Sequence, residues 1–126
     1  MIIKKINNNI ISFFNEKEEM ILSWSEVLNG DFVEFILNGD LINELMFELE
    51  DEITSYLLIG KKVELNIEQL SYLGSSGMAM LLSLQKFCEE KEDYEMVLSH
   101  IPQTIMDEFI ELGFHEILHM KGLEES

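Results

Sequence analysis

Two adjacent serines, Ser75 and Ser76, are the residues of this chain best placed to carry chemistry. They lie between Gly74 and Gly77, after an alternating apolar–polar stretch and before a long apolar-rich stretch without glycine or proline. This pattern predicts the end of a strand followed by the start of a helix. A helix N-terminus has unpaired N–H groups and a partial positive charge, so it favours a capping hydroxyl or a phosphate. The two glycines let a ligand or partner approach the backbone closely, which favours a functional role over a simple cap.

A second motif, His-Glu-Ile-Leu-His from His115 to His119, matches the H-E-x-x-H signature of zinc proteases. That signature works only when a helix places both histidines on one face. Here a third ligand would have to be Glu124 or Glu125, which lie close by in a polar tail. On a strand, residues four apart are separated by about 13 Å and do not share one ion. We interpret the match as chance and expect no metal, no other cofactor and no catalysis; a metal-dependent hydrolase is the enzyme alternative.

The serine loop differs from known catalytic and nucleotide-binding loops. Gly74-Ser75-Ser76-Gly77 is one residue shorter than a Gly-x-Ser-x-Gly nucleophile elbow. It also lacks the lysine of a phosphate-binding P-loop. The sequence therefore indicates a binding or modification site and not an active site.

Hydrophobic periodicity predicts the elements that position the serines. Alternation predicts strands over residues 20–27, 32–37, 61–68 and 94–99, and helical spacing predicts helices over 41–58, 78–91 and 102–112. The turn signal Asn29-Gly30-Asp31 joins the first two strands in a hairpin, and Asp40 is a candidate cap for the first helix. Residues 114–120 form a last strand or a short terminal segment, and 121–126 a polar tail. Strand–helix–strand order predicts a parallel pair with the helix across one face.

Two regions allow two interpretations. Residues 1–18 form an N-terminal extension that fits either a helix or a hairpin of residues 2–6 and 10–14 turning at 7–9. We expect it to pack on the domain formed by residues 19–126. On the helix after the serines, apolar residues form two sets, Met78, Leu81 and Leu82 on one side and Met80, Leu84 and Phe87 on another.

Composition narrows the functional classes. The chain has 126 residues, 47% of them hydrophobic, which suits one domain with a real core. Its net charge of −17 argues against nucleic acid or an anionic membrane surface as a direct partner and favours a partner with a basic surface. The single cysteine, Cys88, cannot form an internal disulfide, and no apolar run approaches membrane-spanning length. We expect a cytoplasmic protein without direct membrane insertion.

The order of these motifs resembles the STAS domain family (sulfate transporter and anti-sigma factor antagonist). Residues 35–41, Phe-Ile-Leu-Asn-Gly-Asp-Leu, resemble the family's opening strand signature, and residues 63–80 resemble its central strand, serine loop and helix. His100-Ile101-Pro102 and residues 109–114 resemble its late strand, Pro-led helix and closing glycine. The likeness runs from about residue 32 to residue 120. It departs from the family at Gly74, where an aspartate usually precedes the serine pair.

The resemblance implies an α/β fold, with a mixed sheet of four to five strands and helices predominantly on one face. It implies a regulator of transcription like the anti-anti-sigma factors. These proteins bind an anti-sigma factor that is also a serine kinase, and they dissociate from it when they are phosphorylated. The implied phosphorylation site is Ser75, with Ser76 as the alternative. The family register places Met78, Leu81 and Leu82 on the sheet and leaves Met80 and Leu84 exposed; the alternative is that both sets are core. The implied partner-contact residues are Asp40, Gly74, Ser75, Ser76, Gly77, Met78, Met80 and Leu84.

Because of Gly74, a second interpretation remains open. In it, the chain is a STAS protein that is not phosphorylated and that acts as an adaptor subunit of a transport, lipid-trafficking or stress-signalling complex. Homodimer formation is a further open expectation.

Overall fold

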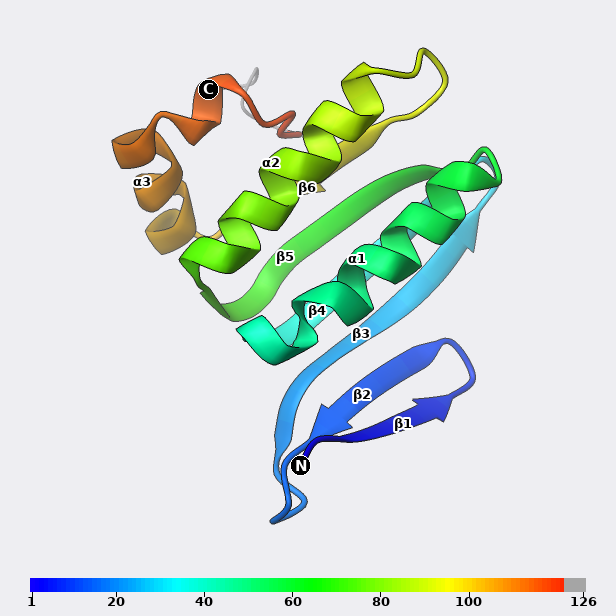
Figure 1. The fold of residues 1–126 in the computed structure, drawn as a ribbon, viewed down its shortest axis with the longest axis vertical. Coiled ribbons are helices and arrows are strands. Elements are labelled where there is room, and N and C mark those ends of the chain that lie inside the picture. Colours follow the sequence, from blue (N-terminus) through cyan, green and yellow to red (C-terminus); the bar gives the residue numbers. More distant parts are fainter. Residues whose placement is uncertain (122–126) are drawn as a thin grey trace.

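A computed structural model describes residues 1–121 as a mixed β-sheet with helices packed mainly on one face (Figure 1). Its elements in chain order are β1 (Ile3–Asn7), β2 (Ile10–Phe14), β3 (Met20–Asn29), β4 (Phe32–Leu41), α1 (Asn43–Leu58), β5 (Lys62–Leu73), α2 (Ser75–Glu89), β6 (Met96–Ser99), α3 (Gln103–Leu112) and a 3₁₀ turn (Phe114–Glu116).

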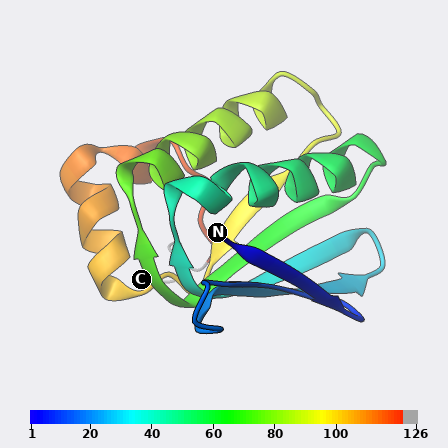
Figure 2. The ribbon, with the colours of Figure 1, turned by 60° about the horizontal axis from the view of Figure 1, so that its bottom comes forward.

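The six strands of the sheet lie side by side in chain order. β1 to β4 pair antiparallel, whereas β4 with β5 and β5 with β6 pair parallel. Parallel neighbours need a crossover, and α1 and α2 provide the two crossovers on the same face of the sheet (Figure 2). The predicted α/β fold is confirmed. The sheet has six strands and not four to five, because the N-terminal hairpin continues it.

Of the two interpretations of the N-terminal segment, the structure has the hairpin. β1 and β2 are joined through Asn8 and Asn9, and Asn8 adopts a positive φ of 58°. β2 pairs with β3, and the Phe13 ring packs on the Trp24 ring with centroids 5.4 Å apart. Lys4 forms an ion pair with Glu48 of α1 at 3.0 Å. The hairpin is thus part of the sheet and also contacts a helix.

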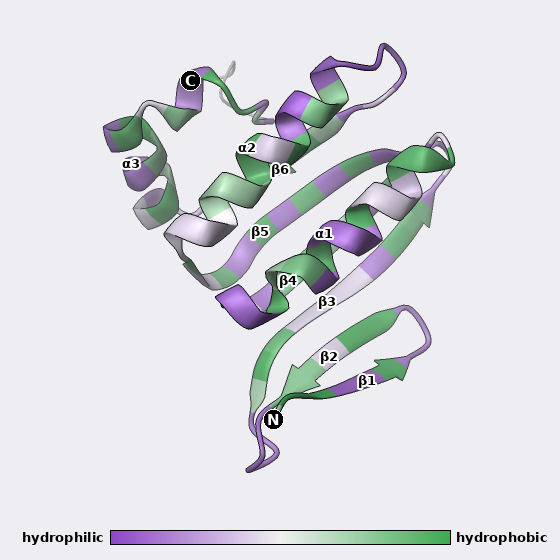
Figure 3. Ribbon diagram, viewed as in Figure 1, coloured by the Kyte–Doolittle hydropathy of each residue, from purple (hydrophilic) through white to green (hydrophobic). Residues whose placement is uncertain are grey.

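Alternating residues build the core beneath α1 and α2 (Figure 3). Along β5, Val63, Leu65 and Ile67 are buried, and the residues between them face the open side of the sheet. Helical spacing supplies the other half, since α1 buries one stripe of residues: Leu45, Leu49, Ile53 and Leu57. The predicted core faces of this strand and this helix are confirmed.

α2 buries more of its surface than the family register implied. Met80 and Leu84 are each only 3% exposed, so the expectation that they form an exposed surface is wrong, and for these two residues the alternative of a core position is confirmed. Leu82, which that register placed on the sheet, is only half-buried. The reason is that α1 packs on one side of α2, and the C-terminal segment contacts its other side through His119 (Figure 1). Gln85 is buried because its Oε1 accepts a hydrogen bond from the backbone N–H of His119 at 3.1 Å.

β4 and β5 extend further than periodicity indicated. β5 continues to Leu73, where it pairs with the end of β4, so Asp40 lies opposite Tyr72 in the sheet. Strand pairing therefore holds Asp40 in extended conformation, and its predicted role as a helix cap is wrong. Ile42 takes the N-cap position of α1, without a side-chain hydrogen bond.

The chain after α3 differs from a regular last strand. Pro102 stands at the N-cap of α3, and Gly113, with φ of 78°, ends the helix. After the 3₁₀ turn, Met120 forms a single parallel bridge with Leu98 of β6. Of the two predictions for residues 114–120, the short terminal segment is therefore the better description. All of the predicted polar tail except Lys121 lies outside the described residues.

Candidate functional site

The serine loop lies where β5 ends and α2 begins. α2 starts at Ser75, three residues before the predicted start at Met78, and Gly74 takes the N-cap position with φ −74° and ψ 178°. The first helical hydrogen bond runs from the Met78 N–H to the Gly74 carbonyl at 3.0 Å. The N–H groups before Met78 therefore have no intrahelical acceptor, and they give this end of the helix its affinity for anions.

The two glycines of the loop have different neighbours. A β-carbon at Gly77 would lie 2.5 Å from Leu73 Cδ1 and 3.4 Å from Leu41 Cδ2, so the helix start packs directly on the ends of β4 and β5. A β-carbon at Gly74 would lie 2.7 Å from the hydroxyl of Tyr72, whose side chain is 54% exposed. Gly77 therefore fixes the position of the helix, whereas Gly74 makes room for a surface tyrosine.

The predicted contact residues have unequal access to solvent. Ser75 is exposed, Ser76, Gly74 and Asp40 are half-buried, and Gly77, Met78, Met80 and Leu84 are buried. The fold brings Asp40 to the strand end next to Tyr72 and so close to the loop in the sheet. Among the predicted residues, Ser75 is the one that a partner or a kinase reaches most easily.

Next to Ser75 the surface is hollowed, with a cavity volume of about 540 Å³. The hollow lies between the end of β5, the first turn of α2 and one side of α3; its lining is Ser71, Tyr72, Leu73, Gly74, Ser75, Met78, Thr104, Ile105, Glu108 and Leu112. Tyr72 and Leu112 are large side chains that are more than half exposed there. The hollow therefore offers apolar contact area beside a hydroxyl group and helix N–H groups.

Glu108 is the only side chain with a formal charge in this lining. No lysine of the described residues lines the hollow, so a phosphate on Ser75 would meet no cationic side chain there. Its charge would be balanced by the helix N-terminus alone and would stay exposed to a partner.

The contribution of α3 to this site was not predicted from the sequence. Thr104, Glu108 and Leu112 lie about one turn apart and share one side of α3. No sequence signal pairs α3 with the serine loop, because about 30 residues separate them. Tyr72, two residues before Gly74, could have been noted as a large side chain next to the loop.

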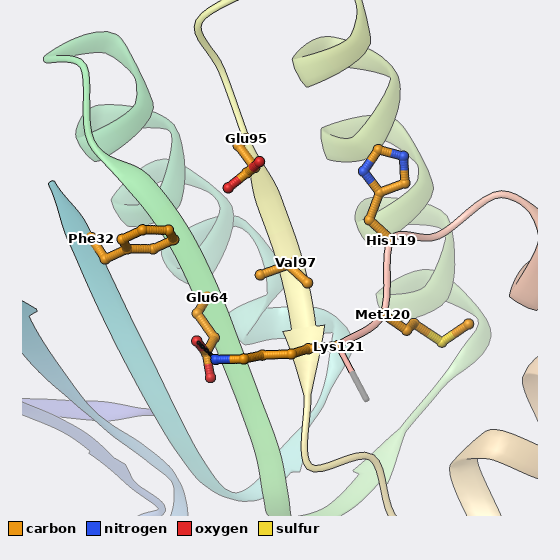
Figure 4. Close-up of a pocket in the computed structure, with 7 residues that line it drawn as sticks. All are labelled: Phe32, Glu64, Glu95, Val97, His119, Met120 and Lys121. Carbon is orange, nitrogen blue, oxygen red and sulfur yellow. Dashed lines mark hydrogen bonds and ion pairs between the residues drawn. The ribbon is translucent and has the colours of Figure 1, made fainter. Parts of the chain in front are cut away.

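A second hollow, of about 450 Å³, lies on the open face of the sheet, away from the serines (Figure 4). Its central carboxylate, Glu64, accepts hydrogen bonds from Ser99 at 2.6 Å and from Lys121 at 3.2 Å. Burial opposes ionisation of Glu64, but these hydrogen bonds and the Lys121 charge outweigh it and hold the pKa of Glu64 below its usual value. Because its central polar groups are paired with one another, we place the candidate site at the serine loop.

Of the other potentially reactive residues, Cys88 lies in α2 and two histidines lie in the segment after α3. His115 lies in the single 3₁₀ turn and His119 beyond it, so no α-helix carries both histidines of the H-E-x-x-H motif. Within residues 1–121, no group of three or more histidine, cysteine or acidic side chains is placed to hold a metal ion. Glu124 and Glu125, the candidate third ligands, lie outside the described residues. Cys88 is buried in α2, and burial raises the pKa of its thiol to about 11.

Within residues 1–121, no helix combines the length and the apolar character that a transmembrane helix needs.

Comparison with known proteins matches the sequence to the STAS domain model over residues 3–125. No curated protein matches the chain. Among solved structures, an anti-sigma factor antagonist from Mycobacterium paratuberculosis aligns with TM-score 0.68 and 10% identity, covering 82% of this chain and 89% of that one. The phosphorylated form of the Bacillus cell fate determinant SpoIIAA aligns with TM-score 0.61 and 20% identity over 81% and 94% of the two chains. A sulfate transporter family protein from Wolinella succinogenes gives TM-score 0.56 and 17% identity over 78% and 83%.

Proposed function

This chain belongs to the STAS domain family, and from that premise we propose that it is a regulatory binding protein of the anti-sigma factor antagonist kind. Its partner is an anti-sigma factor with serine kinase activity, and phosphorylation of Ser75 releases that partner. The observation that carries the proposal is the exposed Ser75 at the first position of α2, beside a hollow whose walls are partly apolar. A chain with this role acts in transcriptional signalling in the cytoplasm.

The geometry suits a phosphate switch in both states. In the free protein, the N–H groups of the first turn of α2 stabilise a phosphate on Ser75. Phosphorylation adds a charge of about −1.5 to −2 at neutral pH. In a complex, a partner that covers the hollow would have to desolvate this charge next to the carboxylate of Glu108. The modification therefore weakens binding without disturbing the fold.

Ser75 is favoured over Ser76 as the phosphate acceptor. Ser75 is exposed, whereas Ser76 is half-buried. A kinase has to bring the hydroxyl in line with the γ-phosphate, which needs an accessible oxygen. A Bacillus protein with the same fold has been solved in a phosphorylated form, which supports a phosphate-dependent function for this fold.

We test the proposal by replacing Ser75 with glutamate and using Ser83→Glu as the matched control. Ser83 is also an exposed serine of α2, two turns further along the helix. Tagged chains are purified from the native cell, and co-purified proteins are identified by mass spectrometry. Wild type and Ser83→Glu should retain an anti-sigma factor related to serine kinases. The affinity of Ser75→Glu for this partner should be at least about ten-fold lower, equivalent to about 1.4 kcal/mol of binding free energy.

Incubation of the purified partner with ATP and the wild-type chain should add one phosphate, which peptide mapping places on Ser75. Equal recovery of the partner by Ser75→Glu and wild type would contradict the switch.

A second candidate function rests on Gly74. Gly74 leaves the helix N-cap without a side chain, where the family usually has aspartate. If Ser75 is not phosphorylated, the same surface is the constant binding surface of a STAS adaptor in a transport, lipid-trafficking or stress-signalling complex. The sulfate transporter family protein shares this fold. Recovery of such a complex, unchanged by Ser75→Glu, would favour the adaptor.

A further inference from the structure

A cluster of carboxyl groups lies between β3 and α1, away from the serine loop. Glu26 of β3 accepts a hydrogen bond from Trp24 Nε1 at 2.9 Å and another from the Tyr56 hydroxyl at 2.7 Å. Both donors are neutral groups, and both contacts are partly shielded from solvent. The Glu26 carboxylate is therefore fixed between the sheet and the second half of α1.

A second carboxyl group, that of Glu52, lies one helical turn before Tyr56, whose hydroxyl bonds Glu26. Glu52 precedes Tyr56 by four residues, so both side chains lie on the same side of the helix. The other ionisable groups that face the pair are Glu48 of α1 and Lys4 of β1, which form an ion pair with each other at 3.0 Å. Three carboxyl groups thus lie near one lysine, which pairs with Glu48. Neighbouring like charges disfavour full ionisation.

We propose that Glu26 and Glu52 form a proton-dependent latch between β3 and α1. With one proton held on Glu52, its carboxylic acid donates a hydrogen bond to the Glu26 carboxylate and the latch is closed. When this proton is lost to solvent, two carboxylates face each other and the contact between α1 and β3 loosens. α1 also packs against α2, which carries Ser75 (Figure 1).

The ionisation properties of the groups agree with this geometry. The hydrogen bond to Glu26, followed by burial and the nearby negative charges, raises the pKa of Glu52 from 4.5 to about 7. Burial opposes ionisation of Glu26, but hydrogen bonds from Glu52, Tyr56 and Trp24 outweigh it and lower the pKa of Glu26. Burial and the hydrogen bond to Glu26 raise the pKa of Tyr56 to about 12, so its hydroxyl stays a neutral donor throughout the relevant range. The latch therefore responds close to neutral pH.

Trp24 reports directly on the latch. It is the only tryptophan of the chain, it is 1% exposed, and its indole N–H is bonded to Glu26. In the full chain, we expect the tryptophan emission to change in one step with a midpoint near pH 7 while the protein stays folded. Glu52→Gln should abolish the step, because the amide donates to Glu26 at every pH. Asp51→Asn, an exposed neighbour on the same helix, is the matched control and should keep the step.

Two direct measurements complement fluorescence. In wild type with ¹³C-labelled glutamate, the Glu52 carboxyl signal should titrate near pH 7. Hydrogen exchange, corrected for the intrinsic effect of pH, should show the amides of residues 52–58 losing protection at least three-fold more than those of α2 between pH 6 and pH 8.

The proposal is overturned if no emission step occurs between pH 5.5 and 8.5, or if the step persists in Glu52→Gln, since a group other than Glu52 would then be its source. A Glu52 carboxyl signal that titrates near its ordinary value, or equal loss of protection in α1 and α2, also overturns it.

Discussion

Gly39 is a position where the sheet leaves no room for a side chain. It adopts φ +107°, and a β-carbon there would overlap the backbone carbonyl oxygen of Ile21 on the neighbouring strand. Gly39 lies in β4 shortly before the strand end that pairs with Tyr72 and Leu73 of β5. Exchanging Gly39 for alanine therefore tests how closely β3 and β4 are packed beside the candidate site.

The expected cost has two parts. A positive φ costs an L-residue about 1–2 kcal/mol. Inserting a methyl group against a backbone atom adds about 1–3 kcal/mol, because β3 and β4 must move apart. Alanine also lowers the conformational entropy of the unfolded chain, which offsets about 0.4–1 kcal/mol of this cost. We expect Gly39→Ala to lower the free energy of unfolding by about 3 kcal/mol, a large share of the ~5–15 kcal/mol of an ordinary domain.

Gly30→Ala is the matched control. Gly30 also has a positive φ, +62°, but a β-carbon there meets no atom within 4 Å. Its replacement should cost only about 1 kcal/mol from the backbone conformation. Urea unfolding followed by Trp24 emission should place the midpoint of Gly39→Ala about 1 M below that of Gly30→Ala at equal slope. If the two variants differ by less than about 0.5 kcal/mol, the close approach to Ile21 does not constrain the sheet and the reasoning is refuted.

Two further predictions concern the helix start and the carboxyl pair. Gly74→Asp should raise the free energy of unfolding by about 0.5 kcal/mol in urea, because an aspartate caps the helix and the exposed Tyr72 can turn away; a loss above about 1 kcal/mol would show that Tyr72 is held in place. Because the folded pKa of Glu52 is raised from 4.5 to about 7, its stabilising contribution is complete below pH 4.5 and lost as pH rises through 7. The full shift corresponds to about 3 kcal/mol, which solvent screening of this half-exposed group reduces to about 1 kcal/mol. Wild type should therefore lose about 1 kcal/mol relative to Glu52→Gln between pH 5 and pH 8, and parallel pH profiles would contradict this.

The sequence predicts those parts of the fold that one buried face determines. The alternation along β5 identifies Val63, Leu65 and Ile67 as core residues, and all three are buried. The stripe along α1 likewise predicts its buried side, including Leu45 and Leu57. In both elements a single periodic pattern is enough, because each packs against one layer.

Predictions fail where long-range pairing or a second covering layer decides the outcome. Asp40 has the residue type of a helix cap, but pairing with β5 keeps it in a strand. Met80 and Leu84 lie on the second apolar side of α2, which α1 and the C-terminal segment cover. Gln85 is the local sign of this covering, since its polar group is buried and bonded to the backbone of His119. This hydrogen bond connects α2 to a segment that is distant in the sequence.

Gly74 shows how the sequence and the structure together define the candidate site. In sequence it is only a departure from the usual aspartate of the family. In the structure it leaves the N-terminal N–H groups of α2 without a competing side-chain acceptor and leaves room for the Tyr72 hydroxyl. An aspartate here would place a second negative charge next to a phosphate on Ser75, and its absence lowers that repulsion. Under the switch proposed above, glycine in place of aspartate would remove a contact for the kinase and would favour the phosphorylated state of the free chain, so the two effects would act on different steps.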